Sequence, residues 1–431
     1  MLAVGANSTA IMAALPNMRT ELLLTSAGVE WAVNAYLVVS APFIMLGGQA
    51  ADRFGAPLAS MVGLALFGAA SCIIAAADTQ AELLVGRAFQ GLAAAVAVPS
   101  TLAGVDTGAV PERRAAAIAA WTGFLMLGFS IGPLFGGALT HFTGWRVIFW
   151  LNVPLMLTVI AGLASAGSAT ASARGTQSRR ADWIGFVLLT TLMVSLVFAL
   201  RALPHARAAP LPVIGPFALA ATAFFLLLTV ESRASAPLVD LSFFARRRFV
   251  MGLVIGSLSM FSIMSLLLYF NLYAQSREGL GFTALEAGAS LLPLSVGLLA
   301  LSLSASAVAA QVGLRNAMTG GMTLIAIASA IIGLAIAGDK MVLLAIGFFV
   351  MGAGLAVPYA LAPQLALSAL PGAQAGQGSG IVNACTFLGG SAGIAGGGAA
   401  LALGGFLAVL AMIALAGIIG AALSHRISET A

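Results

Sequence analysis

The sequence predicts an all-α polytopic membrane protein, and three observations support this fold class. Of its 431 residues, 61% are hydrophobic and 8% are charged, and the mean hydropathy is +1.06. Soluble domains carry about 25% charged residues, so a water-soluble fold of this composition is excluded. The apolar runs are continuous rather than alternating, which excludes a membrane β-barrel. Arginines gather in the short loops between these runs, as expected for connections between transmembrane helices.

The apolar runs predict fourteen transmembrane helices. They cover approximately residues 2–17, 30–50, 58–77, 81–104, 115–139, 145–167, 182–200, 211–230, 248–273, 284–310, 316–337, 340–366, 377–398 and 400–424. Pro16 comes before the first run reaches the ~20 residues that a span prefers, so we expect either a helix that continues past it or a start upstream. Of the nineteen basic residues, twelve fall on one side, six on the other and Arg87 within a span. This bias predicts that both termini are cytoplasmic. The expected location, which accompanies the function expected below, is a bacterial-type inner membrane.

Two polar stretches divide the predicted helices into six, two and six. Residues 168–181 are rich in Ser, Ala and Arg and predict a flexible linker, and residues 231–247 form the second stretch. The predicted organisation is therefore an N-terminal six-helix bundle (1–167), a linker with an inserted two-helix hairpin (168–247) and a C-terminal six-helix bundle (248–431). Two pseudo-symmetric bundles suggest a substrate path between them.

Composition also limits the partners and cofactors. The net charge is +5, but no basic patch is interleaved with aromatic residues, so we assign no nucleic-acid partner. The three histidines and two cysteines show no metal-ligand spacing, and no GxxxxGK[ST] phosphate loop is present. We therefore expect neither a metal nor a cofactor, and ATP is not the driving force. No Ser/His, paired-Asp or His-cluster constellation lies at span depth, which argues against an enzyme.

Four motifs lie in or beside the first six spans. Gly48-Gln-Ala-Ala-Asp52-Arg53-Phe-Gly55 ends the second run, where glycine permits a tight turn and Asp52 can accept from backbone donors. A plain charged turn is the alternative. Arg87 lies within the fourth run, with Gln90 three residues on and therefore on the same helix face. A guanidinium in hydrocarbon costs a few kcal/mol unless it faces a polar cavity, and the alternative is an arginine that snorkels to the surface.

The third motif is Gly128-Phe-Ser-Ile-Gly132-Pro133-Leu-Phe-Gly136-Gly137. Gly128, Gly132 and Gly136 recur every four residues, so on a helix they form one bare stripe that another helix can approach at backbone distance. Pro133 removes one backbone donor and bends the helix. Trp145-Arg146-Val-Ile-Phe-Trp150-Leu-Asn152-Val-Pro154 begins the sixth run, and we interpret it as structural because tryptophan anchors at the membrane boundary.

These motifs, in this order and in these helices, resemble the major facilitator superfamily, and most of all its fourteen-helix drug:proton antiporter branch. The resemblance covers nearly the whole chain. It implies two bundles that rock about a central cavity, with protons exchanged for a small-molecule substrate. It further implies a conformational lock at Gly48, Asp52, Arg53 and Gly55, a proton route at Arg87 and Gln90, and an antiporter motif at Gly128, Gly132, Pro133, Gly136 and Gly137.

Departures from the family pattern affect the mechanism. The helix 1 motif usually carries an aspartate where this chain has Asn7, and asparagine cannot titrate. The weaker copy of the loop signature, Val308 to Arg315, has no acid. We find no carboxylate confidently in mid-membrane, since Glu30 and Glu286 lie near helix ends where N-terminal stabilisation is their expected role. The coupling acid is unassigned, so a displaced acid, substrate-borne protons and uncoupled transport all stay open.

Cavity candidates are the polar or aromatic residues within spans: Asn7, Asn34, Trp121, Met264, Asn271, Tyr359, Asn383 and Phe387. Gly389, Gly393 and Gly397 repeat the four-residue spacing and predict a close helix crossing. The expected function is export of small, fairly apolar drug-like molecules or metabolites by proton antiport, by a monomer in the lipid bilayer. The alternatives are an uptake or lipid-linked carrier on the same fold, and a non-transporting sensor or scaffold.

Overall fold

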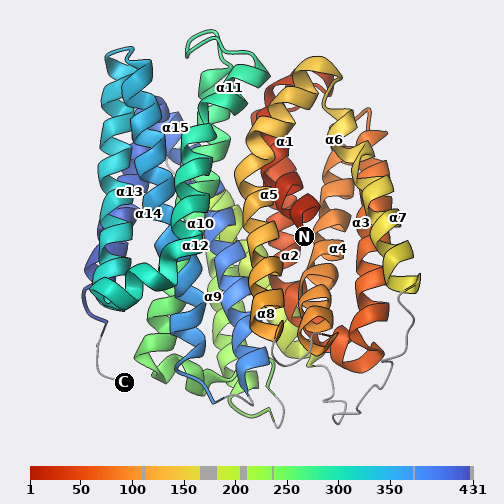
Figure 1. Ribbon diagram of the computed structural model, residues 1–431. Coiled ribbons are helices and arrows are strands. Elements are labelled where there is room, and N and C mark those ends of the chain that lie inside the picture. Colours follow the sequence, from red (N-terminus) through yellow and green to blue (C-terminus); the bar gives the residue numbers. More distant parts are fainter. Residues whose placement is uncertain (109–112, 166–181, 204–210, 235–236, 372–373, 428–431) are drawn as a thin grey trace. The chain divides into compact units, whose positions relative to one another are not determined.

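The computed structural model describes residues 1–108, 113–165, 182–203, 211–234, 237–371 and 374–427, so the predicted 168–181 linker lies outside it. The described residues are helical and divide into two compact units, Met1–Arg179 with Asn271–Ser290, and Arg180–Phe270 with Leu291–Ala431 (Figure 1). Each unit is described by itself. The predicted three-part division at residues 167 and 247 stays a prediction.

The first unit contains α1 (Leu2–Glu21), α2 (Ser26–Phe54), α3 (Ala56–Ala75), α4 (Gln80–Gly108), α5 (Arg114–Phe142), α6 (Arg146–Trp150), α7 (Asn152–Ser165) and α11 (Ala284–Ser290). As expected, α1 continues past Pro16. The single predicted run at 145–167 is divided into α6 and α7 at Leu151. Pro154 explains the break, because proline cannot donate to the carbonyl of residue 150 in the preceding turn.

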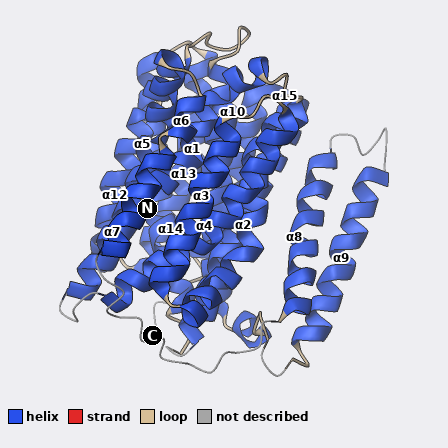
Figure 2. Cartoon of the chain, turned by 90° about the vertical axis from the view of Figure 1, so that its right-hand side faces the viewer, coloured by secondary structure: helices blue, strands red, loops and turns tan. Residues whose placement is uncertain are grey.

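The second unit contains α8 (Trp183–Ala202), α9 (Leu211–Glu231), a 3₁₀ helix (Leu241–Ala245), α10 (Arg247–Ala274, its end in the first unit), α12 (Leu292–Val312), α13 (Leu314–Ala337), α14 (Met341–Leu367) and α15 (Ala375–Ser424). The helices α8 and α9 form a hairpin of neighbouring helices (Figure 2). The 50-residue α15 contains two residues with non-helical backbone, Gly404 and Gly405, at the predicted boundary between two runs.

Twelve helices of the described chain are long and apolar enough to cross a membrane. This number differs from the predicted fourteen in two places. The helix α1 is not among the twelve, because polar residues such as Asn7, Thr9 and Asn17 lower its hydropathy. The helix α15 counts once, although its backbone is interrupted at Gly404 and Gly405.

The glycine stripe of α5 packs against α1. A Cβ atom at Gly128 would lie 2.2 Å from the Leu2 carbonyl oxygen, and one at Gly136 would lie 2.3 Å from that of Ala10. Such distances are too short for any side chain, so glycine is required for this approach. On the same helix, Gly137 and the Pro133 carbonyl meet Ala284 and Gly288 of α11. The predicted close crossing of the stripe is confirmed, and its partner is α1.

Two single-glycine turns connect consecutive helices. Gly55 separates α2 from α3 with φ 87° and ψ 141°, and Gly313 separates α12 from α13 with φ 85° and ψ 146°. Backbone of this kind is open almost only to glycine. The two turns therefore have one geometry, although the Gly55 turn follows Asp52 and Arg53 and the Gly313 turn has no acid before it.

Candidate functional site: a buried hydrogen-bond network

Arg87 lies on α4 and is fully buried. Its Nε donates to the Ala32 carbonyl oxygen of α2 at 2.7 Å, and its Nη1 donates to Gln90 Oε1. The guanidinium carbon lies 4.7 Å from the centre of the Tyr36 ring, a cation–π distance. A snorkelling arginine would expose its charged end, so that alternative is wrong. Arg87 and Gln90 lie on the same helix face, as expected, and are hydrogen-bonded to each other.

The contacts of Arg87 are otherwise neutral. Nη2 is buried without a hydrogen-bond partner, and among the described residues no carboxylate forms an ion pair with the guanidinium. A buried cation usually has an acidic partner because desolvation is costly. Here a carbonyl oxygen, an amide oxygen and an aromatic face stabilise it.

Gln90 extends the network to three further helices. Its Nε2 donates to Ser71 Oγ of α3 at 3.0 Å, and Asn152 Nδ2 of α7 approaches the same oxygen at 3.2 Å. Asn152 Nδ2 also donates to Asn7 Oδ1 of α1 at 3.0 Å. Ser71 in turn donates to the Phe67 carbonyl oxygen. A continuous chain of side-chain hydrogen bonds thus joins Arg87 to Asn7, the position where the family acid is expected.

None of the amide and hydroxyl groups in this chain gains or loses a proton at physiological pH. The network can hold the Arg87 guanidinium in position. It also couples α4 to α1 electrostatically, because linked hydrogen bonds polarise one another. Proton exchange would require another titratable group. Sequence reasoning missed Ser71 and interpreted Asn152 as part of a structural motif. The signal for Asn152 was available, since a polar side chain within an apolar run indicates function.

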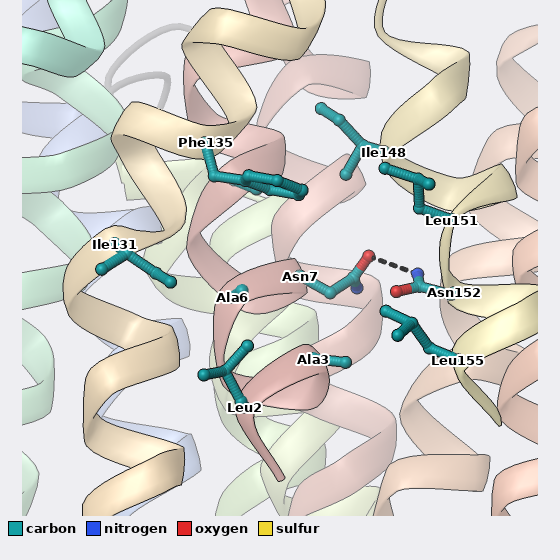
Figure 3. Close-up of a pocket in the computed structure, with 11 residues that line it drawn as sticks. Leu2, Ala3, Ala6, Asn7, Ile131, Phe135, Ile148, Leu151, Asn152 and Leu155 are labelled. Atoms are coloured by element: carbon teal, nitrogen blue, oxygen red, sulfur yellow. Dashed lines mark hydrogen bonds between the residues drawn. The ribbon is translucent and has the colours of Figure 1, made fainter. Parts of the chain in front are cut away.

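A small pocket borders the network at the Asn7–Asn152 pair (Figure 3). Its empty volume is about 450 Å³ including its open side. Its walls come from α1, α5, α6 and α7 and are apolar apart from Asn7 and Asn152: Leu2, Ala3, Ala6, Asn7, Ala10, Ile131, Phe135, Ile148, Leu151, Asn152 and Leu155. In Figure 3 the Asn7 amide oxygen faces Asn152, and Asn7 Nδ2 is buried without a hydrogen-bond partner. Such a pocket suits an apolar group.

The remaining cavity candidates are divided between the two units. In the first unit, Asn34 and Asn271 are fully buried, and Trp121 Nε1 donates to Thr101 Oγ1 at 3.2 Å. In the second unit, Met264 is buried, whereas Tyr359, Asn383 and Phe387 are half-buried. Asn383 bonds within its own helix, to the Ser379 carbonyl oxygen at 2.9 Å. Of these eight residues, only Asn7 lines the described pocket, and a cavity shared by all of them stays a prediction.

The predicted lock residues lie around the Gly55 turn. A Cβ atom placed at Gly48 would have no other atom within 4 Å. Arg53 is exposed, and its guanidinium lies over the Phe54 ring. Asp52 belongs to α2, and its side chain lies outside the described part of the chain. A locking role for these residues stays a prediction. Glu286, by contrast, accepts a hydrogen bond from the Thr283 amide at 2.8 Å at the start of α11, which confirms its expected role at a helix N-terminus.

Comparison with known proteins identifies a family that this chain matches. A sequence model of the Major Facilitator Superfamily matches residues 1–394. The Tetracenomycin C resistance and export protein of Streptomyces glaucescens is 30% identical over 396 residues, which is 92% of this chain and 73% of that protein. The Methylenomycin A resistance protein of Bacillus subtilis (strain 168) is 32% identical over 287 residues, 66% of this chain and 60% of that protein.

A third relative, the Quinolone resistance protein NorB of Staphylococcus aureus (strain MRSA252), is 26% identical over 377 residues, covering 87% of this chain and 80% of that protein. Among solved structures, a peptide transporter, POT, in complex with alafosfalin matches with a TM-score of 0.68 at 15% identity. The match covers 99% of this chain and 92% of the transporter. At that identity the likeness concerns the fold alone.

Proposed function

The chain belongs to the major facilitator superfamily, and on this premise we propose that it exports small, fairly apolar molecules across the inner membrane. The family consists of multi-pass membrane transporters and not of enzymes. The observation that carries the proposal is the fully buried Arg87 network, in a chain whose relatives are named for resistance and export. A scaffold has no need of a buried cation that costs a few kcal/mol to desolvate.

The proposed architecture has fourteen spans with both termini in the cytoplasm. The number of long apolar helices in the described chain supports it. Twelve candidate spans become fourteen when α1, 20 residues long, is added and α15 is divided at Gly404 and Gly405. The hairpin α8–α9 is then the pair inserted between two six-helix sets, as in the drug:proton antiporter branch that the motifs resemble.

We propose proton antiport through alternating access as the mechanism, with Arg87 and Gln90 beside the proton route and Gly48, Asp52, Arg53 and Gly55 as the lock. Supporting this role, Arg87 and Gln90 connect through Ser71 and Asn152 to Asn7. Because these partners of Arg87 do not titrate, the coupling acid must lie elsewhere or the substrate must carry the proton. The proposal favours neutral or weakly acidic substrates, since a site without a carboxylate compensates the desolvation of a cation poorly.

The proposal is tested with purified protein in liposomes under an imposed pH gradient. Efflux is followed for a panel of apolar compounds that includes methylenomycin A, tetracenomycin C and a quinolone, chosen from the names of the relatives. We expect efflux of at least one compound that responds to the gradient. Failure of every compound with folded, wild-type protein would favour the sensor or scaffold alternative.

Efflux is also measured for Arg87→Ala. Its melting temperature is compared with that of Arg53→Ala, which removes an exposed arginine instead of a buried one. We expect Arg87→Ala to abolish efflux while the protein still elutes as a folded species, because the apolar helix contacts around it persist. Arg87→Lys keeps the charge and loses the two-point contact to Ala32 and Gln90, so it should recover only part of the efflux. Near-normal efflux of Arg87→Ala would remove Arg87 from the transport mechanism.

A further inference from the structure

Two carboxylates converge in the second unit, away from the Arg87 network. Asp182 precedes α8, and Glu231 ends α9. A methyl group placed at Gly185 would lie 2.4 Å from Glu231 Oε1 and 2.8 Å from Asp182 Oδ2. The two oxygens therefore approach the same glycine from two different helices.

Glu231 is 3% exposed, and neither of its carboxylate oxygens makes a hydrogen bond. Asp182 Oδ1 caps α8 by accepting from the Gly185 amide at 2.8 Å, whereas Asp182 Oδ2 is buried without a hydrogen-bond partner. Three buried carboxylate oxygens thus lie in one place without a well-formed hydrogen bond, and only the backbone amides of Leu238 and Val239 face the Glu231 carboxylate. Two ionised carboxylates in such a site would repel each other and would both lack solvation, which is unstable without a bound positive species.

The surroundings favour a proton over a metal ion. The backbone amides of Leu238 and Val239 face the Glu231 carboxylate, and amide hydrogens repel a metal cation. The described residues hold no group of three or more His, Cys, Asp or Glu side chains that could bind a metal. Among the described residues, Asp182 is the charged group that faces Glu231, and the contacts from the 237–239 segment are neutral backbone groups.

The same segment is tied to α15. Gln377 Nε2 donates to the carbonyl oxygens of Pro237 and Leu238 at 2.7 and 2.9 Å. The helix α8 also packs along α15. The carboxylate pair therefore lies next to the 237–239 segment, which is hydrogen-bonded to α15.

We propose that Asp182 and Glu231 bind one proton between them, and that this proton holds the start of α8 to the end of α9. With one proton present, one carboxyl group donates to the other and the pair carries a single negative charge. The proton comes from water and returns to it, so no other reactant is involved. Loss of the proton places two negative charges side by side in a buried site and loosens the hairpin.

The proton is detected by infrared spectroscopy on the purified full-length chain at pH 7. Wild type should show the carbonyl stretch of a protonated carboxylic acid, and Glu231→Gln should lose it, because Asp182 alone is ionised at a helix N-terminus. Asp339→Asn, which removes an exposed carboxylate at a turn, should leave the band unchanged. A wild-type spectrum without the band, or a band that survives Glu231→Gln unaltered, would overturn the proposal.

Thermal unfolding provides a second readout that does not depend on transport. The unfolded chain releases its glutamate protons above about pH 4.3, so a fold that retains one proton must lose stability as the pH rises until that proton leaves. Wild type should therefore melt at a lower temperature as the pH rises from 5 toward 8, and Glu231→Gln should show a weaker dependence. If sodium chloride instead raises the melting temperature at constant ionic strength against choline chloride, the site binds a metal cation and the proton proposal is wrong.

Discussion

The α1–α5 crossing of the first unit and the α10–α15 crossing of the second use the same packing device. In the first, Gly128 and Gly136 lie against backbone carbonyls of α1. In the second, a Cβ atom at Gly389 would lie 2.4 Å from the Ser257 carbonyl oxygen, and one at Gly393 would lie 2.4 Å from that of Phe261. The close crossing expected from the Gly389 spacing is confirmed for these two residues.

At the α1–α5 crossing itself Thr9 Oγ1 donates to the Phe129 carbonyl oxygen at 3.1 Å, but the side-chain contacts beside the two crossings differ. Beside α1, side chains bond to side chains from Asn7 through Asn152 and Ser71 to Gln90. At the α10–α15 crossing, hydroxyl groups bond to backbone instead, as Ser257 does to Cys385 and Ser265 does to Gly393, at 2.9 and 2.8 Å. A backbone acceptor is fixed by its helix, whereas an amide side chain can rotate and change partners. The first unit therefore carries contacts that can change partners by rotation of a side chain alone.

The largest expected effect comes from filling the glycine crossings. Gly136→Ala and Gly389→Ala each place a methyl group on backbone atoms that cannot move aside, and overpacking of this kind costs about 1–3 kcal/mol. Gly123→Ala and Gly376→Ala are matched controls on the same two helices, since neither position has an atom within 4 Å of the added group. Melting temperature in detergent should fall for the first pair and rise slightly for the second. Equal behaviour of all four would contradict the packing described for both crossings.

The second largest loss of stability is expected for Asn152→Leu in the first unit. This change removes the donor to Asn7 and to Ser71 and leaves buried amide groups unpaired, at a cost of about 1–3 kcal/mol. Ser265→Ala, its counterpart in the second unit, removes a hydroxyl from helix carbonyls that keep their own bonds and should cost about 0.5–1.5 kcal/mol. Adding Asn7→Leu to Asn152→Leu should recover stability, because both partners are then apolar. A double variant that is simply additive would show that the Asn7–Asn152 hydrogen bond contributes nothing.

Asn7→Asp tests whether the network can be made to titrate. The change restores a carboxylate at the end of the chain that leads to Arg87, and we expect efflux to become more dependent on pH. Folding of the variant is checked by its elution profile, and Asn7→Ser is the neutral control. An unchanged pH dependence, in a protein already coupled to protons, would show that α1 is not the coupling site.

The smallest effect is expected at the far end of α1, where Glu21 accepts from Trp145 Nε1 at 2.6 Å and pairs with Arg146. Partial burial alone would raise the pKa of Glu21, but the hydrogen bonds from Arg146 and Trp145 hold this pKa below its ordinary value. The ion pair therefore stabilises the first unit above about pH 4.3, and the stabilisation is lost as the pH falls through the lower folded pKa.

Because the Glu21 side chain is 48% exposed, the expected loss in Glu21→Gln is about 0–1 kcal/mol. The measurement is a melting curve at pH 7 with and without high salt, since salt screens an exposed pair and not the buried Asn152 contacts. If Glu21→Gln lost more stability than Asn152→Leu, the exposed ion pair would contribute more than the buried amide network, contrary to this prediction.

Much of the fold follows from local properties of the sequence. Apolar length predicted most of the helices, four-residue glycine spacing predicted the Gly136 and Gly389 crossings, and three-residue spacing placed Arg87 and Gln90 on one helix face. The breaks at Leu151 and Leu291 did not appear in the hydropathy, because Pro154 and Pro293 interrupt hydrogen bonding without interrupting the apolar run.

The candidate site was less accessible to sequence reasoning. Asn152 and Ser71 lie 81 residues apart in the chain, and only the packing of α3 against α7 brings them together. A polar residue in an apolar run indicates that it needs a partner, but not which helix supplies one. The Glu231 carboxylate was missed for a different reason. The sequence places it in the polar stretch 231–247 and indicates no role for it, and its burial depends on the 237–239 segment that faces it.

The single-residue turns at Gly55 and Gly313 have a mechanical consequence. Two helices joined by one residue keep their facing ends within about 7 Å of each other, whatever else the protein does. Tilting α2 must therefore carry the start of α3 with it, and α12 must likewise carry α13. The glycine limits the distance between the two helix ends and leaves the angle between the helices to their packing, so the facing ends can be displaced only together.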